Sequence, residues 1–320
     1  MRTVVVIGGG ISGLSIAMHI SDQRPDTRVR ILEASGRLGG VIHTDRSDGW
    51  VCEAGPGAFI DRHPSTRRLI ERLGLSGDII SAGNAVRRRY IRHQGHLHPF
   101  PDSPEALART ALLSETGRLR MRFSPVLPPE HSDQTVSEFA AAHLGKEAAA
   151  MLVDPIVAGI YAGAPDQLSA RSVLPQLVGL ADKGGRVCDA LLGQGQGRLG
   201  KGSMVSISGG LGSLIEALET QLGDRIECNR RVTRLRRGPG HWRVSVDDGE
   251  CIEAEAVVVT AHGQAALQLL GPIDADLEDN LSLIPSAPVA VVNLGFAPGS
   301  VPHPLDGFGY LIPSSEGGSV

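Results

Sequence analysis

The residues best suited to chemistry lie in a glycine-rich loop close to the N-terminus. The segment Gly8-Gly9-Gly10-Ile11-Ser12-Gly13 fits the pattern G-x-G-x-x-G, and Glu33 follows Gly13 by twenty positions. Because glycines have no side chains, they let the backbone contact a pyrophosphate, and the N-terminus of a helix favours the negative charge of that group. An acid about twenty positions further along the chain accepts a hydrogen bond from a ribose. The spacing therefore predicts a dinucleotide site that contains Gly8, Gly9, Gly10, Ile11, Ser12, Gly13 and Glu33.

NAD and FAD share this first motif, so the residues after Glu33 decide between them. In that stretch Arg37 supplies a cation for a pyrophosphate, and Gly39 and Gly40 allow a second close approach of the backbone. A further loop, Gly55-Pro56-Gly57-Ala58, follows nearby. The predicted cofactor contacts of these two loops are Ala34, Arg37, Gly39, Gly40, Val41, Gly55, Pro56, Gly57 and Ala58. This arrangement resembles the FAD-containing amine oxidase superfamily.

Alternating strands and helices are expected to position these loops. Residues 4–7 are a continuous apolar run typical of a buried parallel strand, and residues 11–20 repeat apolar residues at helical spacing. Residues 28–33 form a second strand, and a helix begins at Pro64 and stops at Gly74. The predicted fold class is α/β, a Rossmann-like FAD-binding fold with an inserted helical domain and a mixed β substrate domain.

The rest of the chain divides into further parts. The predicted domains are a discontinuous FAD-binding domain over 1–84 and 203–267, an inserted helical domain facing the substrate or a membrane over 85–202, and the start of a substrate-domain sheet over 268–320. Because no terminal helix closes a core after residue 314, we expect a chain truncated at the C-terminus, without the segment that completes the flavin site.

Within these domains several elements have recognisable patterns. Residues 225–255 alternate through glycine turns as a small antiparallel meander, and the apolar run 256–261 suits a central strand of the first sheet. In the helical domain, Thr135 and Glu138 form a capping box and Pro155 is expected to kink an apolar helix. A flexible connection is predicted over 194–203 and a buried strand over 287–296.

Composition sets the class of protein. With 320 residues, 41% hydrophobic and 21% charged, the chain is folded and globular, and its net charge of -4 provides no field for nucleic acid, which is excluded as a partner. The four cysteines show no C-x-x-C spacing and are interpreted as reduced packing residues. Neither a membrane-spanning run nor a signal peptide is found, so we expect a cytoplasmic protein.

Within the superfamily, nearly the whole chain resembles the protoporphyrinogen oxidase family. The segments that carry this resemblance are Gly8 to Gly13, Arg37 to Gly40, Glu53 to Pro56, Arg87 to Tyr90 with Leu97 to Pro101, Gly159 to Gly163, and Val289 to Leu294 with Gly307 to Gly309. Of these, Gly-Ile-Tyr-Ala-Gly and Gly-Phe-Gly point beyond generic amine oxidases.

The resemblance implies FAD as cofactor and an oxygen-linked oxidation of protoporphyrinogen IX to protoporphyrin IX in haem biosynthesis. It also implies that Val232 touches FAD, that Arg87 pairs with a substrate propionate, and that Gly159 and Leu294 line the tetrapyrrole pocket. No side chain is assigned as a catalytic acid or base, because the flavin itself accepts the hydride. Coproporphyrinogen III oxidation to coproporphyrin III, an amine oxidase-like activity and an inactive FAD-fold fragment stay open as alternatives.

Three further patterns have two interpretations each. Arg87 to Arg89 with Arg92 form a basic patch that either binds substrate or is an ordinary solvated charge run. His93, His96 and His98 lack a carboxylate or cysteine partner nearby, so no metal is predicted. Residues 105–123 mix apolar residues with arginines and form either a surface helix pair or a peripheral contact with the inner membrane face. The sequence also leaves a homodimer open.

Overall fold

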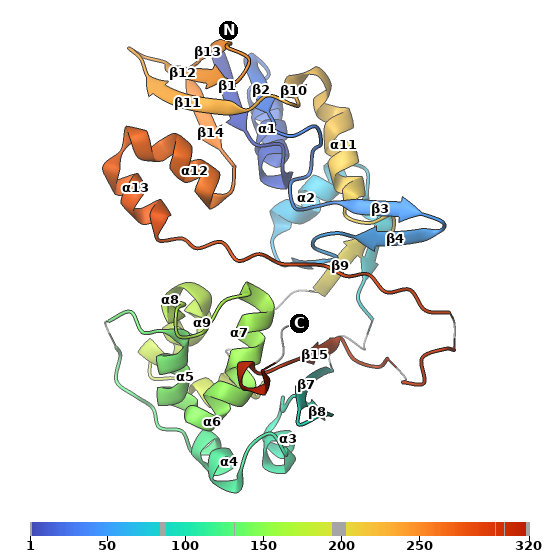
Figure 1. Cartoon of the computed structure of the whole chain (residues 1–320), viewed down its shortest axis with the longest axis vertical. Helices are drawn as coiled ribbons and strands as arrows, with labels where there is room; N and C mark the ends of the chain where they lie inside the picture. Colours follow the sequence, from blue (N-terminus) through green and yellow to red (C-terminus); the bar gives the residue numbers. More distant parts are fainter. Residues whose placement is uncertain are drawn as a thin grey trace. The chain divides into compact units, whose positions relative to one another are not determined.

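The computed structural model describes residues 2–83, 88–130, 132–193, 203–297, 299–303 and 305–317. The chain forms two compact units (Figure 1). The first contains Met1–Ser81, Gly202–Ser286 and Ala290–Gly295, and the second contains Ala82–Lys201, Ala287–Val289 and Phe296–Val320. Each unit is built from segments that are distant in sequence, so neither could be recognised from one stretch of chain.

A four-stranded parallel sheet organises the first unit. Its order is β10-β2-β1-β14, and the strands are β1 (Arg2–Ile7), β2 (Thr27–Leu32), β10 (Ile226–Glu227) and β14 (Ala256–Val259). Helix α1 (Ile11–Gln23) connects β1 to β2, as the glycine motif predicts. The run 256–261 does rejoin the first sheet, but β14 lies at its edge and not at its centre. Its residues are accordingly exposed or half-buried, with none fully enclosed.

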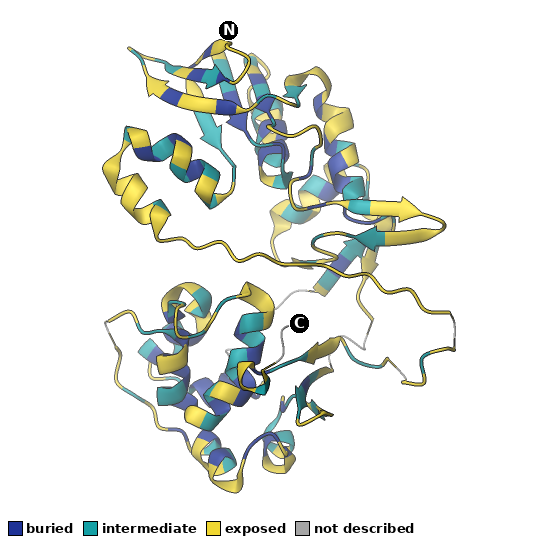
Figure 2. Cartoon of the chain, in the orientation of Figure 1, coloured by how far each residue is buried: buried dark blue, intermediate teal, exposed yellow. Residues whose placement is uncertain are grey.

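Helices and smaller sheets cover this parallel sheet. Helix α11 (Gly212–Leu222) packs against α1, and the apolar side chains between them, among them Leu14, Ala17 and Leu218, are fully buried (Figure 2). The remaining elements of this part are the hairpin β3 (Thr44–Ser47) and β4 (Trp50–Glu53), the antiparallel sheet β5 (Phe59–Asp61), β9 (Ser203–Ile207) and β6 (Ile79–Ser81), helix α2 (Pro64–Arg72), and the short turns η1 (Ser76–Asp78) and η4 (Gly223–Arg225).

The predicted meander is present and packs on the parallel sheet. It consists of β11 (Val232–Arg237), β12 (Trp242–Val246) and β13 (Cys251–Ala254). Its inward residues Val244 and Ile252 share a hydrophobic cluster with Val5 and Leu32 of the parallel sheet. This cluster holds the meander against the strands that carry the first glycine loop.

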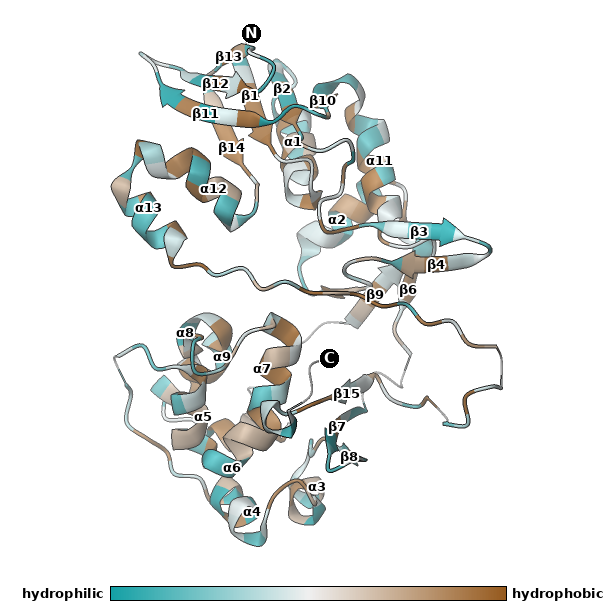
Figure 3. Ribbon diagram, in the orientation of Figure 1, coloured by the Kyte–Doolittle hydropathy of each residue, from teal (hydrophilic) through white to brown (hydrophobic). Residues whose placement is uncertain are grey.

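The chain after the meander is helical at first. Helix α12 (Gly263–Leu270) is followed by η5 (Gly271–Ile273) and α13 (Ala275–Ser282), and residues 268–286 of the predicted 268–320 segment belong to the first unit. The buried strand predicted over 287–296 is wrong. These residues form no strand, although Figure 3 shows hydrophobic parts along this stretch, and Val292 is 75% exposed. An apolar run indicates a buried strand only if a neighbouring strand supplies backbone partners, and none of the described strands pairs with it.

The second unit combines helices with a small sheet. The sheet has the order β15-β7-β8, with β7 (Arg89–His93), β8 (His96–Pro99) and β15 (Gly309–Leu311), so this region does not begin with helices as expected. The helices are α3 (Pro104–Arg109), α4 (Glu115–Arg122), α5 (Val136–Leu144), α6 (Lys146–Ala148), the π-helical turn η3 (Ala149–Val153), α7 (Asp154–Tyr161), α8 (Ala170–Val173), α9 (Pro175–Asp182) and α10 (Val187–Leu191), followed by η6 (Ser314–Glu316) near the end.

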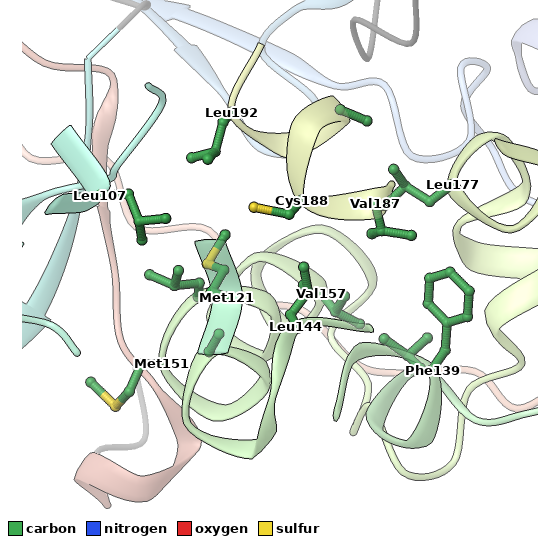
Figure 4. Packing of buried hydrophobic residues seen from close by; sticks show 14 of the residues in the cluster. Leu107, Met121, Phe139, Leu144, Met151, Val157, Leu177, Val187, Cys188 and Leu192 are labelled. Atoms are coloured by element: carbon green, nitrogen blue, oxygen red, sulfur yellow. The ribbon is translucent and has the colours of Figure 1, made fainter. Parts of the chain in front are cut away.

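The helices of the second unit enclose their own core. Side chains from α4, α5, α7 and α10 converge there, with Met121, Leu144, Val157 and Cys188 almost fully buried (Figure 4). The predicted capping box of Thr135 and Glu138 is confirmed at the start of α5. Pro155 stands in the first turn of α7, directly after the π-helical turn. The connection predicted over 194–203 lies, up to residue 202, outside the described residues.

Candidate functional site

The first glycine loop leaves no room for side chains. Gly8 has φ +110°, in the region that favours glycine, and a Cβ on Gly13 would lie 1.9 Å from the carbonyl oxygen of Gly8. Gly10 is the N-cap of α1 and supplies no side chain to the first turn, which also contains no acidic residue. The free N–H groups of this turn, from Ile11, Ser12 and Gly13, are suited to bind an anionic phosphate.

Glu33 lies directly beside this loop. Its Oε2 accepts a hydrogen bond from the Gly9 backbone N–H at 2.7 Å, and its Oε1 accepts from the Ser35 backbone N–H at 2.8 Å and the Ser35 hydroxyl at 2.7 Å. Burial alone would raise the pKa of Glu33, but these hydrogen bonds and the charge of Arg37 outweigh it, so the pKa lies below its ordinary value. Glu33 is therefore an ionised acceptor with a fixed orientation at neutral pH.

The second loop is bonded to the first. The Gly39 N–H donates to the Gly9 carbonyl oxygen at 2.9 Å, and a Cβ on Gly40 would lie 3.4 Å from the Cα of Gly10. Gly39 and Gly40 both have positive φ values, +99° and +61°. Arg37 is exposed and bends back over its own loop, donating to the Gly40 carbonyl oxygen at 2.8 Å. The two loops therefore lie against each other through their backbones, with glycines at the points of close approach.

The third glycine loop meets the second at one point. A Cβ on Gly55 would lie 2.0 Å from the carbonyl oxygen of Val41, so this position accepts only glycine. The Val41 side chain itself is 78% exposed. Pro56, Gly57 and Ala58 are exposed, and a Cβ on Gly57 would meet only the Glu53 Cγ, at 3.9 Å. The close packing that marks the first two loops therefore extends to Gly55 but not to the three residues after it.

Asn229 and Thr260 hold these loops and belong to no predicted motif. The backbone N–H of Asn229 donates to the Ser35 carbonyl oxygen at 2.9 Å, and the Thr260 hydroxyl donates to the Ile7 carbonyl oxygen at 2.9 Å. Glu53, which carries part of the family resemblance, accepts from the Leu211 N–H at 2.6 Å and from the Thr44 hydroxyl at 2.7 Å. Except for the contact between Thr44 and Glu53 within one hairpin, these contacts join residues far apart in sequence, so no short motif could have revealed them.

A charge network fixes the meander beside Glu33. The Arg30 guanidinium on β2 pairs with Glu227 at 2.6 Å and with Glu250 at 2.9 Å, and Arg230 also contacts Glu250. The hydrogen bond with Glu227 raises the pKa of Arg30 and, reciprocally, lowers the pKa of Glu227. Val232, two residues after Arg230, is 9% exposed and lies in the cluster between meander and sheet. Its contact with FAD stays a prediction.

The second unit brings together two segments that carry the family resemblance. β15 pairs in parallel with β7, so Gly309 stands opposite Arg89, and the Arg89 guanidinium lies 5.9 Å from the ring centroid of Phe308. Arg88 forms an ion pair with Asp306. A Cβ on Gly159 of α7 would lie 2.6 Å from Leu311 Cδ2, which places α7 against β15. The Gly-Phe-Gly segment therefore adjoins the hairpin of β7 and β8, which carries Arg89 and Arg92 and is called the basic hairpin below. The Gly-Ile-Tyr-Ala-Gly segment adjoins β15.

The other predicted substrate residues are less well placed. Arg87 lies outside the described residues. Leu294 belongs to the first unit and is 73% exposed, whereas Gly159 belongs to the second. His93 is bonded to Glu316, Nδ1 to Oε1 at 2.6 Å. The described part of the chain contains no group of three or more His, Cys, Asp or Glu side chains that could hold a metal ion.

With this geometry in place, comparison with known proteins defines the class. The model of the flavin containing amine oxidoreductase family matches residues 11–319. The chain therefore belongs to that family, and it is an oxidoreductase with FAD as its cofactor. The predicted family, cofactor and Rossmann-like α/β fold are confirmed.

Particular relatives narrow the likeness to porphyrinogen oxidases. The chain is 33% identical to coproporphyrinogen III oxidase of Bacillus subtilis (strain 168) over 97% of its own length and 70% of the relative's. It is also 33% identical to human protoporphyrinogen oxidase, over 98% of its length and 71% of the relative's. A crystal structure from Exiguobacterium sp. 255-15, described as "Putative protoporphyrinogen oxidase", superposes with a TM-score of 0.73 at 30% identity, covering 87% of this chain and 63% of that one.

A putrescine oxidase structure matches with a TM-score of 0.63 but only 19% identity, which shows a shared fold alone. The porphyrinogen oxidases are thus similar to this chain in sequence as well as in fold.

Proposed function

We propose that this protein oxidises a porphyrinogen to the corresponding porphyrin in haem biosynthesis, with molecular oxygen as the final acceptor. The observation that carries the proposal is the identity of 33% to two porphyrinogen oxidases across 97% and 98% of the chain. It is supported by a pyrophosphate surface from which side chains are excluded at Gly13, Gly39 and Gly55.

The substrate we propose first is protoporphyrinogen IX, which would be converted to protoporphyrin IX. Coproporphyrinogen III is the second candidate, because a coproporphyrinogen III oxidase matches the chain at the same identity as the human protoporphyrinogen oxidase. The two macrocycles share a reduced ring and propionates, so the choice between them depends on how many carboxylates the protein binds. An amine substrate has weaker support, since the likeness to the putrescine oxidase structure, at 19% identity, is one of fold alone.

The first unit would hold the adenosine and pyrophosphate of FAD. The N–H groups at the start of α1 and the backbone of Gly39 and Gly40 would contact the phosphates, and Glu33 would accept a hydrogen bond from the ribose. When bound, FAD supplies the acceptor for a hydride from a porphyrinogen carbon. The chain's own task is to orient a flat, anionic substrate, for which no side-chain acid or base is required.

The second unit would supply cationic groups to the substrate. We propose that Arg87 pairs with a propionate and that Gly159 and Leu294 line the tetrapyrrole pocket. In support, the neighbouring Arg89 has no carboxylate partner among the described residues and lies over Phe308, so a cation is available on this hairpin. Arg88 is already paired with Asp306. The assignment of a FAD-binding and a substrate domain to the two units is part of this proposal.

We also propose a cytoplasmic location with peripheral contact to the inner membrane face. None of the helices within the described residues has the length and apolar character needed to cross a membrane. The peripheral contact rests on residues 105–123, where Leu119 and Phe123 are 52% and 73% exposed beside Arg120 and Arg122.

The test combines cofactor binding with turnover. Purified chain supplied with FAD should acquire flavin absorbance and a higher melting temperature, because a ligand that binds the folded state stabilises it. Under anaerobic conditions, protoporphyrinogen IX should then bleach the flavin, and porphyrin fluorescence should appear when oxygen is admitted. Protein that binds FAD but is bleached by putrescine and by neither porphyrinogen would overturn the proposal. Protein that acquires no flavin would favour the inactive-fragment alternative.

A further inference from the structure

A cavity of about 260 Å³ lies inside the second unit, apart from the basic hairpin. Helices α5, α8 and α9 form its floor, and the segments 127–130 and 132–134 border it. The floor is apolar: Phe139, Ala170, Val178 and Ala181 line it and are between 1% and 6% exposed. Such a surface binds small apolar molecules by removing them from water.

One polar side chain interrupts this floor. His143 lines the cavity, is 7% exposed, and has its ring centroid 4.4 Å from that of Phe139. Among the described residues His143 forms no side-chain hydrogen bond, and its ring nitrogens are not among the fully enclosed polar atoms that lack a partner. Burial and, to a smaller extent, the charge of Arg120 lower the pKa of His143, so its ring is neutral at neutral pH. A neutral imidazole presents one donor and one acceptor.

The charges at the rim select against anions. Arg171 pairs with Asp182 at 3.1 Å and donates to the Glu130 carbonyl oxygen at 2.6 Å. The single lining guanidinium is therefore neutralised by a lining carboxylate. A carboxylate ligand would find no lining cation free of a carboxylate partner. The size of the cavity and the lack of such a cation together exclude a porphyrinogen, since sites for drug-sized ligands already occupy about 300 to 1,000 Å³.

We propose that this cavity is a binding site for a small neutral aromatic molecule with one hydroxyl group, of the phenol class. Its ring packs against Phe139, Val178 and Ala181, and its hydroxyl forms a hydrogen bond with His143. Aromatic rings at this spacing accept a third ring in stacked or edge-on geometry. The site is distinct from the proposed substrate residues and does not depend on the proposed function.

The experiment is a ligand-observed NMR titration of the FAD-loaded chain with phenol, toluene and benzoate. Phenol should bind more tightly than toluene, because only phenol satisfies His143, and benzoate should not bind. The variant His143→Phe should weaken phenol binding about fivefold, the loss expected for one hydrogen bond, and should leave toluene unaffected. The exposed His19 on α1 provides the matched control, His19→Phe, which should change nothing.

A second variant tests the cavity itself. Ala181→Leu fills the floor without touching the imidazole and should abolish binding of both phenol and toluene, while flavin content and melting temperature show that the chain is folded. The proposal is overturned if the unmodified chain does not bind phenol, if benzoate binds as well as phenol, or if phenol affinity is the same in His143→Phe and Ala181→Leu as in the unmodified chain. A cavity that holds only water would give the first of these results.

Discussion

The glycine loops of the first unit and the basic hairpin of the second unit differ in what they present to a ligand. In the first unit, backbone atoms approach one another so closely that a Cβ at Gly13 or Gly55 would lie about 2 Å from a carbonyl oxygen. In the second, the groups that would contact a ligand are long cationic side chains such as Arg89, over Phe308. One site is therefore determined by shape, and the other by charge.

This difference implies different sensitivities to substitution. A surface made of backbone atoms cannot adjust when a methyl group is added. At Gly159 of α7, by contrast, an added Cβ would meet Leu311 Cδ2, which is the end of a flexible side chain. Charges act over longer distances but are screened by salt. We therefore expect substitutions at the tightly packed glycines of the first unit to abolish cofactor binding, and substitutions in the second unit to change substrate affinity by degrees.

The largest effect should follow Gly13→Ala. The added methyl group would lie 1.9 Å from the Gly8 carbonyl oxygen and 2.8 Å from the Thr260 hydroxyl, so β1 and α1 must separate. FAD binding should be lost, as measured by flavin absorbance after gel filtration. The matched control, Gly159→Ala in the second unit, should keep its flavin, because Leu311 can rotate away. Equal flavin content in the two variants would contradict the comparison.

The next largest effect is expected for Arg87→Ala. A charge-assisted hydrogen bond from an arginine to a propionate contributes about 2 to 3 kcal/mol. KM for a porphyrinogen should thus rise by roughly one to two orders of magnitude, with flavin content unchanged. Steady-state kinetics by porphyrin fluorescence measures this. An unaltered KM would assign the role to Arg88, Arg89 or Arg92, and loss of FAD would show that Arg87 is structural.

The same comparison explains what the sequence could predict. The motif from Gly8 to Gly13 and the acid Glu33 were recognisable because a turn, a helix start and a strand end follow one another at short range. Asn229 and Thr260 hold the same loops but reach them across about 190 to 250 positions, and no local rule describes such contacts. The apolar stretch 287–296 was misread as a strand, because the pattern reports composition and not the presence of a pairing partner.

The second unit was harder to predict for the same reason. The capping box at Thr135 is local and was found, whereas the pairing of β15 with β7 joins residues more than 200 positions apart. The cavity beside His143 had no sequence signal, since its floor comes from three helices whose apolar residues look like ordinary core. Chemistry that depends on tertiary contacts therefore required the structure.

A smaller effect is expected for Glu33→Gln in the first unit. The amide keeps an acceptor but loses the charge, so the Kd for FAD should rise about tenfold, which corresponds to one charge-assisted hydrogen bond. Isothermal titration of the flavin-free chain would measure it. A Kd equal to that of the unmodified chain would show that Glu33 only holds the loop and does not contact the ribose.

Glu33 also predicts a pH dependence of stability. Its pKa is lower in the folded chain than the ordinary carboxyl value, so its ionised form stabilises the fold at pH values above that ordinary value. This contribution should disappear as the pH falls through the lowered pKa. Denaturant unfolding should accordingly show Glu33→Gln to be less stable at neutral pH, with the difference from the unmodified chain shrinking in acid. A difference that grows in acid would contradict this sign.

The smallest effect should follow Asp306→Asn in the second unit. Arg88 and Asp306 form an exposed ion pair, with side chains 65% and 36% exposed, and such pairs contribute about 0 to 1 kcal/mol to stability. The melting temperature should therefore change little. Without the carboxylate, however, the Arg88 guanidinium has lost the partner that neutralises it and can pair with the substrate, so KM should fall by a small factor of about two to five. The fall should be larger for coproporphyrinogen III, which carries more carboxylates, than for protoporphyrinogen IX.

Because the side chains of residues 88 and 306 are exposed, raising the ionic strength should remove most of this fall in KM. The control is Asp279→Asn, which removes the same charge from an exposed acid on α13 of the first unit, outside the unit that contains the hairpin. If both variants lower KM equally, the net charge of the chain and not the hairpin governs substrate binding. If Asp306→Asn instead releases FAD, the proposed separation between a cofactor unit and a substrate unit is wrong.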